Sequence, residues 1–374
     1  MQVADLALQR SKYKHLSDDE WRWLLQQVEG RERTADKLPT FAAMPDWWYP
    51  VRLSCEQCSS ELTARYKASL TSQNSNFVDL TGGYGVDTYF LSEQFAHTDY
   101  VEQNAELCRI AAHNFAGKSI RIHNTSAEEF LVSAGSYDLI YLDPARRDSH
   151  GGKVFRLADC TPNLVELLPT LLAHGKRLLL KLSPMLDLTQ AIKELSVFSL
   201  QWSVYVVAIK NEVKEVLLLS GGTGQITAID LAKKGQAFVF TREEETNCEA
   251  INVRGTVDGE SVNYLYEPNA AILKAGAYKL VAQRFGLRTL DVNTHLYVSD
   301  TFIPNFPGRV WIIKGEPQKM KGEKANVLCR NYPLTPEQLK QKLHLRDGGT
   351  DFIIGCRVAG KPTLFLAERV EDVH

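Results

Sequence analysis

An apolar stretch that ends abruptly in a glycine cluster, residues 77–85, constrains the fold of this 374-residue chain more than any other feature. Phe-Val-Asp-Leu is typical of a buried parallel strand, and the Gly82–Gly85 turn that follows allows positive φ and close approach of the backbone to a ligand. A helix expected from about Val86 would point its free N–H groups into the same space. Glu102 ends a second short strand, at the spacing at which an acidic side chain accepts the hydroxyls of a ribose. The pattern predicts a nucleotide-shaped pocket.

Strand-like and helix-like segments alternate through residues 77–220, which predicts a parallel sheet with helices on both faces. Pro144 prevents further ladder pairing, so the fourth strand ends with Asp143 at the carboxyl edge, where open α/β sheets bind ligands. The turn at 210–212 is so short that the last two strands must form an antiparallel hairpin. The long loop 148–161 at the ligand edge is expected to be a substrate or lid element. We expect strands at 77–80, 99–102, 120–123, 137–143, 177–182, 202–209 and 216–220, and helices at 105–115, 162–174 and 191–195.

Composition sets outer bounds on function. With 44% apolar residues the chain can build at least two cores, and a net charge of -2 provides no global attraction for nucleic acid or membrane. Seven cysteines without a pattern favour a reducing compartment, and the lone Cys55-x-x-Cys58 pair is expected to be structural. The nine histidines are dispersed, so no metal site is expected. No apolar run reaches the length of a membrane span or signal peptide, and we expect a cytoplasmic protein.

Residues 1–75 read as a helical cap. Ser17 and Glu20 form a capping box, and Ser54 is expected to cap a helix that continues to Leu70. The loop between these helices carries the aromatic run Trp47–Tyr49, which could stack on bases. Packing of the cap onto the next domain is the simpler interpretation.

The pattern changes after the glycine-rich boundary at Gly221, so residues 76–222 are expected to form one domain. Two α+β units are predicted beyond it, 223–300 and 301–374, the first with a helix at 268–285 and a solvated acidic turn at 243–245. Residues 309–346 hold nine Lys and Arg against three Glu, a basic region that could contact RNA phosphates or simply be a solvated face. The cations concerned are Lys314, Lys319, Lys321, Lys324, Arg330, Lys340, Lys342 and Arg346. The second unit is expected to have strands at 310–314, 325–330, 351–358 and 363–368, and a helix at 336–344.

Residues 77–220 resemble the class I S-adenosylmethionine-dependent methyltransferases, whose Rossmann-like sheet has six parallel strands and one antiparallel strand. The Asp-Pro-Ala-Arg-Arg string at 143–147, the Lys-Leu-Ser-Pro-Met stretch at 181–185 and the tail extend the likeness to a bacterial group with a C-terminal THUMP-like domain, for which RNA modification is the implied function. Residues 223–300 are expected to be ferredoxin-like and residues 301–374 THUMP-like. The resemblance implies S-adenosylmethionine as cofactor. The residues that it places around the amino-acid end, the ribose and the adenine are Asp79, Thr81, Gly82, Gly83, Gly85, Glu102, Ser126, Ala127, Glu128 and Asp143.

The motif at 143–146 departs from the Asp/Asn-Pro-Pro-Tyr/Phe pattern of that superfamily, because Ala145 and Arg146 replace a proline and an aromatic residue. A base amine as acceptor would donate hydrogen bonds to Asp143 and the Pro144 carbonyl, with Arg146 stacked on the base. Carbon-5 methylation of pyrimidines is disfavoured, since no cysteine follows the fifth strand.

A ribose 2'-hydroxyl as acceptor is suggested by a different set of residues. Lys67, Asp143, Lys181 and Glu212 resemble the Lys-Asp-Lys-Glu tetrad of ribose 2'-O-methyltransferases, with Lys210 close to Glu212 in sequence. Alternatively, Lys181 and Glu212 form a structural ion pair. Two other function classes stay open: a dinucleotide oxidoreductase, disfavoured because the third glycine of GxGxxG is missing, and a non-catalytic RNA-binding protein that keeps the cofactor fold.

Overall fold

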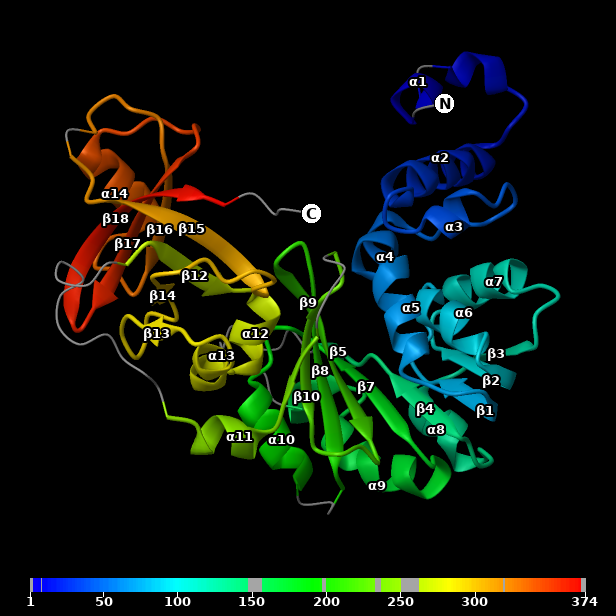
Figure 1. The fold of residues 1–374 in the computed structure, drawn as a ribbon. Helices are drawn as coiled ribbons and strands as arrows, with labels where there is room; N and C mark the ends of the chain where they lie inside the picture. Colours follow the sequence, from blue (N-terminus) through cyan, green and yellow to red (C-terminus); the bar gives the residue numbers. More distant parts are fainter. Residues whose placement is uncertain are drawn as a thin grey trace. The chain divides into compact units, whose positions relative to one another are not determined.

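The computed structural model describes residues 3–7, 9–146, 157–196, 200–232, 237–249, 262–318 and 320–370, which Figure 1 draws as a ribbon. The chain divides into two compact units. The first contains residues 1–203 and 215–223, and the second contains residues 204–214 and 224–374. The boundary between the units falls within the second strand of one hairpin, residues 212–220. Residues 212–214 of this strand belong to the second unit, and residues from Glu215 onward belong to the first.

The N-terminal cap of the first unit is helical, as predicted. Ser17 accepts a hydrogen bond from the Glu20 N–H, and Glu20 returns one to the Ser17 backbone, which completes the capping box. The predicted helix from Ser54 to Leu70 is wrong, because the chain is extended at Cys58 and Ser60 caps a new helix through the Thr63 N–H. The helices of the cap are α1 (Val3–Ala7), α2 (Asp18–Thr34), α3 (Pro39–Ala42), α4 (Arg52–Gln57) and α5 (Glu61–Ser69).

The sheet of the first unit confirms the expected parallel architecture. Its strands are β1 (Asn74–Asp79), β2 (Phe95–Glu102), β3 (Ile120–Asn124), β4 (Leu139–Leu142), β7 (Leu178–Leu182) and β9 (Glu212–Ser220). They lie in the order β9-β7-β4-β1-β2-β3, and every neighbouring pair is parallel except β7 with β9. The helices between them are α6 (Val86–Ser92), α7 (Ala105–Asn114), α8 (Ala127–Val132), α9 (Leu164–His174) and α10 (Leu188–Ser196).

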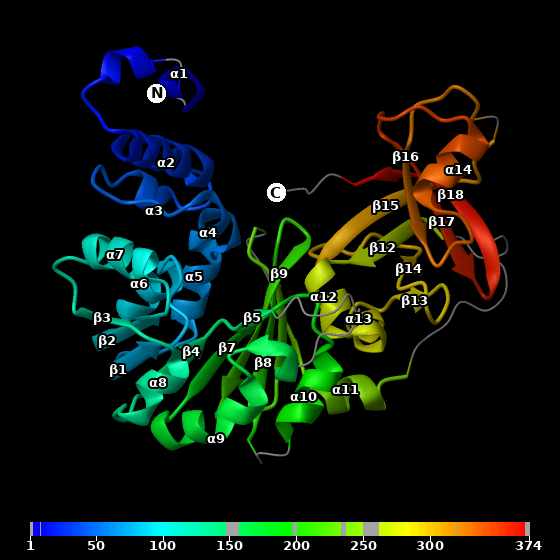
Figure 2. The same cartoon turned by 180° about the vertical axis from the view of Figure 1, so that it is seen from behind.

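Helices cover both faces of this sheet. One face packs into an aromatic-rich core with α6, α7 and the cap, and Tyr100 of β2 lies fully buried in that core. Figures 1 and 2 show α6 and α7 on one side of β1–β3 and α8 and α9 on the other. The carboxyl ends of β1, β2 and β4 consequently meet at one edge of the sheet, where the glycine turn begins.

The predicted terminal hairpin is confirmed by its turn. Lys210 and Asn211 both have positive φ, 52° and 64°, as a two-residue hairpin turn requires. Both of their N–H groups donate to the Asp230 carboxylate, at 3.0 and 2.6 Å. Strand β8 (Trp202–Ile209) also pairs in parallel with β10 (Ile226–Asp230), which pairs antiparallel with β11 (Phe238–Phe240). Residues 226–230, which were expected in a separate α+β unit, therefore form a strand beside β8 in the same sheet.

The second unit contains a seven-stranded sheet in the order β13-β14-β12-β15-β18-β17-β16. Its strands are β12 (Tyr264–Pro268), β13 (Arg288–Thr289), β14 (Tyr297–Ser299), β15 (Gly308–Gly315), β16 (Asn326–Arg330), β17 (Asp351–Val358) and β18 (Lys361–Arg369). Strand β12 pairs with both β14 and β15, so the segments on either side of residue 308 share one sheet. The predicted strands at 310–314, 325–330, 351–358 and 363–368 are confirmed to within a few residues.

The helices of the second unit correct two predictions. The single helix expected at 268–285 is interrupted by Gly276, which adopts the left-handed conformation and separates α12 (Ala270–Ala275) from α13 (Tyr278–Arg284). The acidic run 243–245 is not a turn but part of α11 (Arg242–Asn247), where Glu245 accepts hydrogen bonds from three backbone N–H groups at the start of α13. Helix α14 (Pro336–Leu343) is capped by Thr335, as expected for its N1 proline.

Candidate active site

The glycine turn adopts a backbone that other residues would not fit. Gly83 and Gly85 have positive φ, 54° and 82°. A Cβ built on Gly82 would lie 2.1 Å from the Tyr100 ring, and one on Gly85 would lie 2.5 Å from the Phe115 ring. These contacts are far below van der Waals distance, so glycine is required for the turn to lie close over the sheet edge.

Glu102 meets this turn across the edge of the sheet. Its Oε2 accepts a hydrogen bond from the Gly83 N–H at 2.9 Å, and its Oε1 accepts one from the Asn104 N–H at 2.8 Å. The Asn124 amide donates to the Glu102 carbonyl at 2.9 Å, which holds the ends of β2 and β3 together. The structure therefore brings the predicted ribose-binding carboxylate to the predicted glycine turn.

The predicted adenine-contacting residues follow β3 at the same edge. Ser126 is the N-cap of α8, with its side chain bonded to the Glu129 N–H. Ala127 is buried and Glu128 is exposed. Their contact with a cofactor stays a prediction.

Asp79 braces the turn from inside the protein. It is 1% exposed, and it accepts hydrogen bonds from the Thr81 N–H at 2.9 Å and the Thr88 hydroxyl at 2.6 Å. Burial raises the pKa of Asp79 to about 7, although these hydrogen bonds oppose the rise. Its predicted contact with the amino-acid end of a cofactor stays a prediction.

Thr81 connects the glycine turn to the predicted catalytic motif. Its hydroxyl accepts a hydrogen bond from the Asp143 N–H at 2.7 Å. The Asp143 carboxylate in turn forms an ion pair with the Lys181 amine, and their side chains are 38% and 13% exposed. Burial alone would lower the pKa of Lys181, but the carboxylates of Asp143, Asp87 and Glu215 outweigh that effect and raise it. Lys181 is therefore a protonated amine at neutral pH.

Pro144 is partly buried directly after Asp143. Arg146 lies in β5 (Ala145–Arg146), which pairs antiparallel with β6 (Cys160–Thr161). Most of the expected substrate or lid loop, 148–161, lies outside the described residues. Only residues 157–161 of this loop are described. The expected roles of Arg146 and of this loop stay predictions.

A buried ion cluster lies behind the Asp143–Lys181 pair. Lys67 is fully buried and donates to both carboxylate oxygens of Glu215, at 2.8 and 2.7 Å. The same amine lies 3.2 Å from Asp87 Oδ1. Asp87 Oδ2 accepts hydrogen bonds from the Ser59 hydroxyl at 2.7 Å and the Tyr141 hydroxyl at 2.6 Å. Two carboxylates thus share one buried lysine.

This cluster corrects the predicted Lys-Asp-Lys-Glu set. The expected Lys181–Glu212 ion pair is wrong: Lys181 pairs with Asp143, and Glu212 is exposed and pairs with Lys214 at 2.6 Å. The buried glutamate of β9 is Glu215, three residues further along the strand. Because side chains alternate between faces, Glu212 and Glu215 point to opposite sides. Asp87 was missed altogether, since an acidic residue in the first turn of a helix is common for helix-dipole reasons alone.

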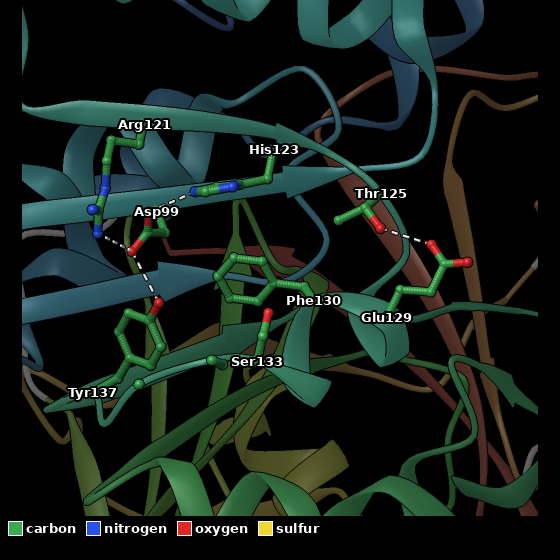
Figure 3. Close-up of a pocket in the computed structure, with 10 residues that line it drawn as sticks. Asp99, Arg121, His123, Thr125, Glu129, Phe130, Ser133 and Tyr137 are labelled. Carbon is green, nitrogen blue, oxygen red and sulfur yellow. Dashed lines mark hydrogen bonds and ion pairs between the residues drawn. The ribbon is translucent and has the colours of Figure 1, made fainter.

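A cavity of about 450 Å³ lies beside the edge strand β3 and under α8, away from the glycine turn. Figure 3 shows Arg121, His123 and Tyr137 converging on the Asp99 carboxylate, at 2.8, 2.7 and 2.9 Å. The other residues that line it are Thr125, Glu129, Phe130, Ser133, Ala134 and Gly135. None of the predicted cofactor-binding residues lines this cavity. Both oxygens of the buried Asp99 carboxylate are thus engaged by side chains of the cavity wall, so Asp99 holds these side chains in place.

The aromatic run of the cap is used for packing, as the simpler interpretation predicted. Trp47 is buried, stacks on Phe41 with ring centres 4.0 Å apart, and donates from Nε1 to the Tyr84 hydroxyl at 2.9 Å. Trp48 is partly buried and stacks on His113 at 3.7 Å.

The Cys55-x-x-Cys58 pair has the features of structural thiols. Burial raises the pKa of Cys55 to about 12 and also raises that of Cys58, so both remain protonated. Within the described ranges, no three or more His, Cys, Asp and Glu side chains gather as metal ligands would. Nor does any helix there have the length and apolarity to cross a bilayer.

Much of the predicted basic region is paired internally. Lys314 binds Asp351 at 2.8 Å and Glu368 at 2.6 Å, and Lys340 pairs with Asp347. Arg330 pairs with Glu267 at 2.6 Å, and Arg346 donates to the Gly322 carbonyl at 2.8 Å. Within residues 309–346, as far as the structure describes them, the cations that are exposed and without a partner are Lys321, Lys324 and Lys342. Lys319 lies outside the described residues.

Comparison with known proteins identifies families and solved structures that are similar to this chain. Family models match residues 264–307 as a ferredoxin-like domain and residues 313–369 as a THUMP domain-like segment. A search of curated proteins finds no match. Among solved structures, an rRNA methylase from Streptococcus thermophilus is 12% identical, covering 43% of this chain and 93% of that chain with a TM-score of 0.32. A candidate methyltransferase from Streptococcus mutans in complex with SAH is also 12% identical, covering 43% and 95% with a TM-score of 0.31. These two likenesses are too weak to carry an argument.

One solved structure is similar over nearly the whole molecule. A candidate methyltransferase from Porphyromonas gingivalis W83 is 33% identical, covers 95% of this chain and 92% of that chain, and superposes with a TM-score of 0.83. Because the match covers 95% of this chain, it includes parts of both compact units. The chain belongs to the class I S-adenosylmethionine-dependent methyltransferases that carry ferredoxin-like and THUMP-like domains at the C-terminus.

Proposed function

We propose that the protein methylates RNA, with S-adenosylmethionine as methyl donor, at the sheet edge formed by β1, β2 and β4. The observation that carries the proposal is the Asp143–Lys181 ion pair, joined through Thr81 to the glycine turn that Glu102 contacts. This chain of contacts places acid and amine side chains next to the turn that would hold the donor. The THUMP-like domain favours RNA as the acceptor.

The residues of the turn fit this cofactor. Gly82 and Gly85 leave no side chain over the sheet edge, and Glu102 offers two carboxylate oxygens whose present partners are backbone N–H groups. Those oxygens suit the two hydroxyls of a ribose. Thr81, Gly83 and Asp79 would surround the amino-acid end, and Ser126, Ala127 and Glu128 the adenine. When bound, the cofactor supplies a methyl group activated by a positively charged sulfur.

Methyl transfer requires the protein to align an acceptor and to handle its proton. Lys181, held protonated by Asp143, can donate a hydrogen bond to a hydroxyl oxygen, and the Asp143 carboxylate can accept the proton that the hydroxyl loses as the methyl group is transferred. With Lys67 and Glu215 behind this pair, the buried set matches the Lys-Asp-Lys-Glu composition of ribose 2'-O-methyltransferases. A ribose 2'-hydroxyl is therefore the acceptor that the geometry favours. A base amine bound to Asp143 and the Pro144 carbonyl, with Arg146 stacked on the base, is the second candidate.

Nucleoside mass spectrometry tests the proposal. Total RNA from cells with and without the gene should differ by one methylated nucleoside, and its identity distinguishes ribose from base methylation. If the two nucleoside profiles are identical and the purified protein still binds RNA, the chain is a non-catalytic RNA-binding protein.

Replacing Glu102 with Ala should weaken S-adenosylmethionine binding by about 1 to 3 kcal/mol, because it removes a charged acceptor of two hydrogen bonds. Isothermal titration calorimetry measures the change. Glu106→Ala is the matched control, since Glu106 is exposed on α7 and pairs with Arg109. Equal affinities for Glu102→Ala and the unmodified protein would remove Glu102 from the site.

Replacing Lys181 with Ala separates the two acceptors. Loss of the amine should reduce the methylation rate about 100-fold or more if it activates a hydroxyl, whereas a base amine held by Asp143 and Pro144 would be affected only mildly. Single-turnover transfer from tritiated cofactor gives the rate. Lys176→Ala is the control, because Lys176 forms an exposed ion pair with Asp138.

The exposed lysines of the tail should contribute to RNA affinity and leave cofactor affinity unchanged. Reversing the charge of Lys321 and Lys324 should flatten the salt dependence of RNA binding by roughly one unit of slope for each lost phosphate contact. Fluorescence anisotropy at several salt concentrations measures the slope. An unchanged slope would identify these lysines as a solvated face.

A further inference from the structure

Two arginines meet a single buried carboxylate at one end of the sheet of the second unit, and a third arginine lies on the same face. Glu267 of β12 stands directly opposite Arg309 of β15, so their side chains share a face. Arg369 of β18 is opposite Trp311, two residues along β15, and lies on that same face. Arg330 ends β16, on the face that it shares with Cys356 of the core.

The sheet must curl to bring these residues together. Three strands separate β12 from β16, which in a flat sheet would keep them about 19 Å apart. Nevertheless Arg330 Nε donates to Glu267 Oε1 at 2.6 Å. Figures 1 and 2 show the strong twist of β15–β18 that this contact requires. Arg309 and Arg330 are therefore brought together at this end of the sheet, with Arg369 on the same face, and we call these three residues the arginine mouth.

Glu267 orients two of these guanidinium groups. Its side chain is 2% exposed, and Arg309 donates to its Oε2 from both Nε, at 2.8 Å, and Nη2. The Arg309 guanidinium also lies 5.4 Å over the Trp311 ring. Arg330 uses Nε for Glu267 and Nη1 for the Cys329 carbonyl at 3.1 Å. Each guanidinium group is thus held on one side. Less conformational entropy is therefore lost when its remaining N–H groups bind a ligand.

The two guanidinium groups keep donors that Glu267 does not use. Among the described residues, Nη1 of Arg309 and Nη2 of Arg330 have no partner, and the two side chains are 28% and 40% exposed. Arg369 is exposed and likewise unpaired within the described ranges. One arginine suffices to neutralise a buried glutamate, so the other two leave an excess positive charge at the arginine mouth. A purely structural bridge does not account for that excess.

We propose that the arginine mouth binds a phosphate group, namely a phosphodiester of the RNA substrate. Planar, pre-oriented guanidinium forks match the geometry of phosphate oxygens and bind them bidentately. The inference rests on the proposed RNA methylation for the source of the phosphate. The proposal assigns phosphate recognition to the arginine mouth and not to the exposed lysines 321, 324 and 342. Glu267 fixes the guanidinium groups, whereas it does not hold the lysine side chains.

The decisive variant is Glu267→Gln, assayed by anisotropy with labelled RNA from a strain that lacks the gene. It makes the mouth more positive, so binding by net charge alone would become tighter. If Glu267 works by orienting the forks, binding becomes weaker, by about tenfold. Arg330→Lys keeps the charge but loses the fork and should also weaken binding about tenfold. Lys314→Gln, which removes a charge from the opposite face of β15, should have little effect.

Thermal unfolding and S-adenosylmethionine affinity of each variant establish that the whole chain remains folded. Unweakened binding by folded Glu267→Gln and Arg330→Lys would overturn the site and leave the proposed methylation untouched. Displacement of RNA by an equal concentration of inorganic pyrophosphate would reassign the mouth to a free phosphate ligand. Failure of the unmodified protein to bind RNA would remove the proposed function together with this inference.

Discussion

Replacing Asp143 with Ala should abolish methyl transfer and leave S-adenosylmethionine binding largely intact. The carboxylate holds Lys181 for a hydroxyl acceptor, and it would itself accept the proton of a base amine, so both schemes require it. Its place is fixed by the proline that follows and by the backbone bond to Thr81. The Thr81 bond uses the Asp143 N–H and survives the substitution, which is why the cofactor turn should keep its shape.

Transfer of tritium from labelled cofactor to RNA of a deletion strain measures this effect, and calorimetry measures cofactor binding. Asp19→Ala is the control, because Asp19 lies on α2 and forms an exposed ion pair with Arg22. Full activity of Asp143→Ala would contradict both acceptor schemes.

Replacing Lys67 with Met should lower the free energy of unfolding by about 3 to 5 kcal/mol. The substitution keeps most of the side-chain volume but leaves Glu215 and Asp87 buried without their shared cation. The nearby Lys181 helps to lower the pKa of Asp87 against the effect of burial, yet it is already paired with Asp143. Uncompensated buried charge is therefore the dominant consequence.

Urea unfolding followed by circular dichroism measures this loss. Adding Glu215→Gln to Lys67→Met removes one unpaired charge and should recover part of the stability. Lys176→Met, at an exposed ion pair, should change stability by less than about 0.5 kcal/mol. A Lys67→Met variant as stable as this control would mean that the cluster contributes nothing to the fold.

The parallel sheet and the glycine turn could be predicted because their signals are local. Apolar runs bounded by Gly or Pro specify strands such as β1 and β4, and Gly82 and Pro144 mark the ends of those strands within a few residues. The hairpin could be predicted for the same reason, since a turn as short as Lys210–Asn211 permits only one arrangement. These signals depend on neighbours in the chain.

The charge partners could not be predicted, because they are distant in sequence and depend on which face a side chain takes. Glu212 and Glu215 are the same residue type and cannot be distinguished in the sequence. Only the position of each along β9 decides that Glu215 is buried and Glu212 is exposed. Lys314 and Arg330 read as free cations until the fold brings Glu368 and Glu267 to them. The break at Gly276 was missed for a related reason, since the apolar spacing of 268–285 continues across it.

The pairing of β12 with β15 has a consequence for how the C-terminal part of the chain can be divided into fragments. The ferredoxin-like match ends at residue 307 and the THUMP-like match begins at residue 313, yet β12 and β15 are hydrogen-bonded neighbours in one sheet. A chain cut between the two matches would expose an open strand edge on each fragment, and such edges pair with other chains and aggregate. The two segments therefore form one folding module, which should be expressed or transplanted as a whole.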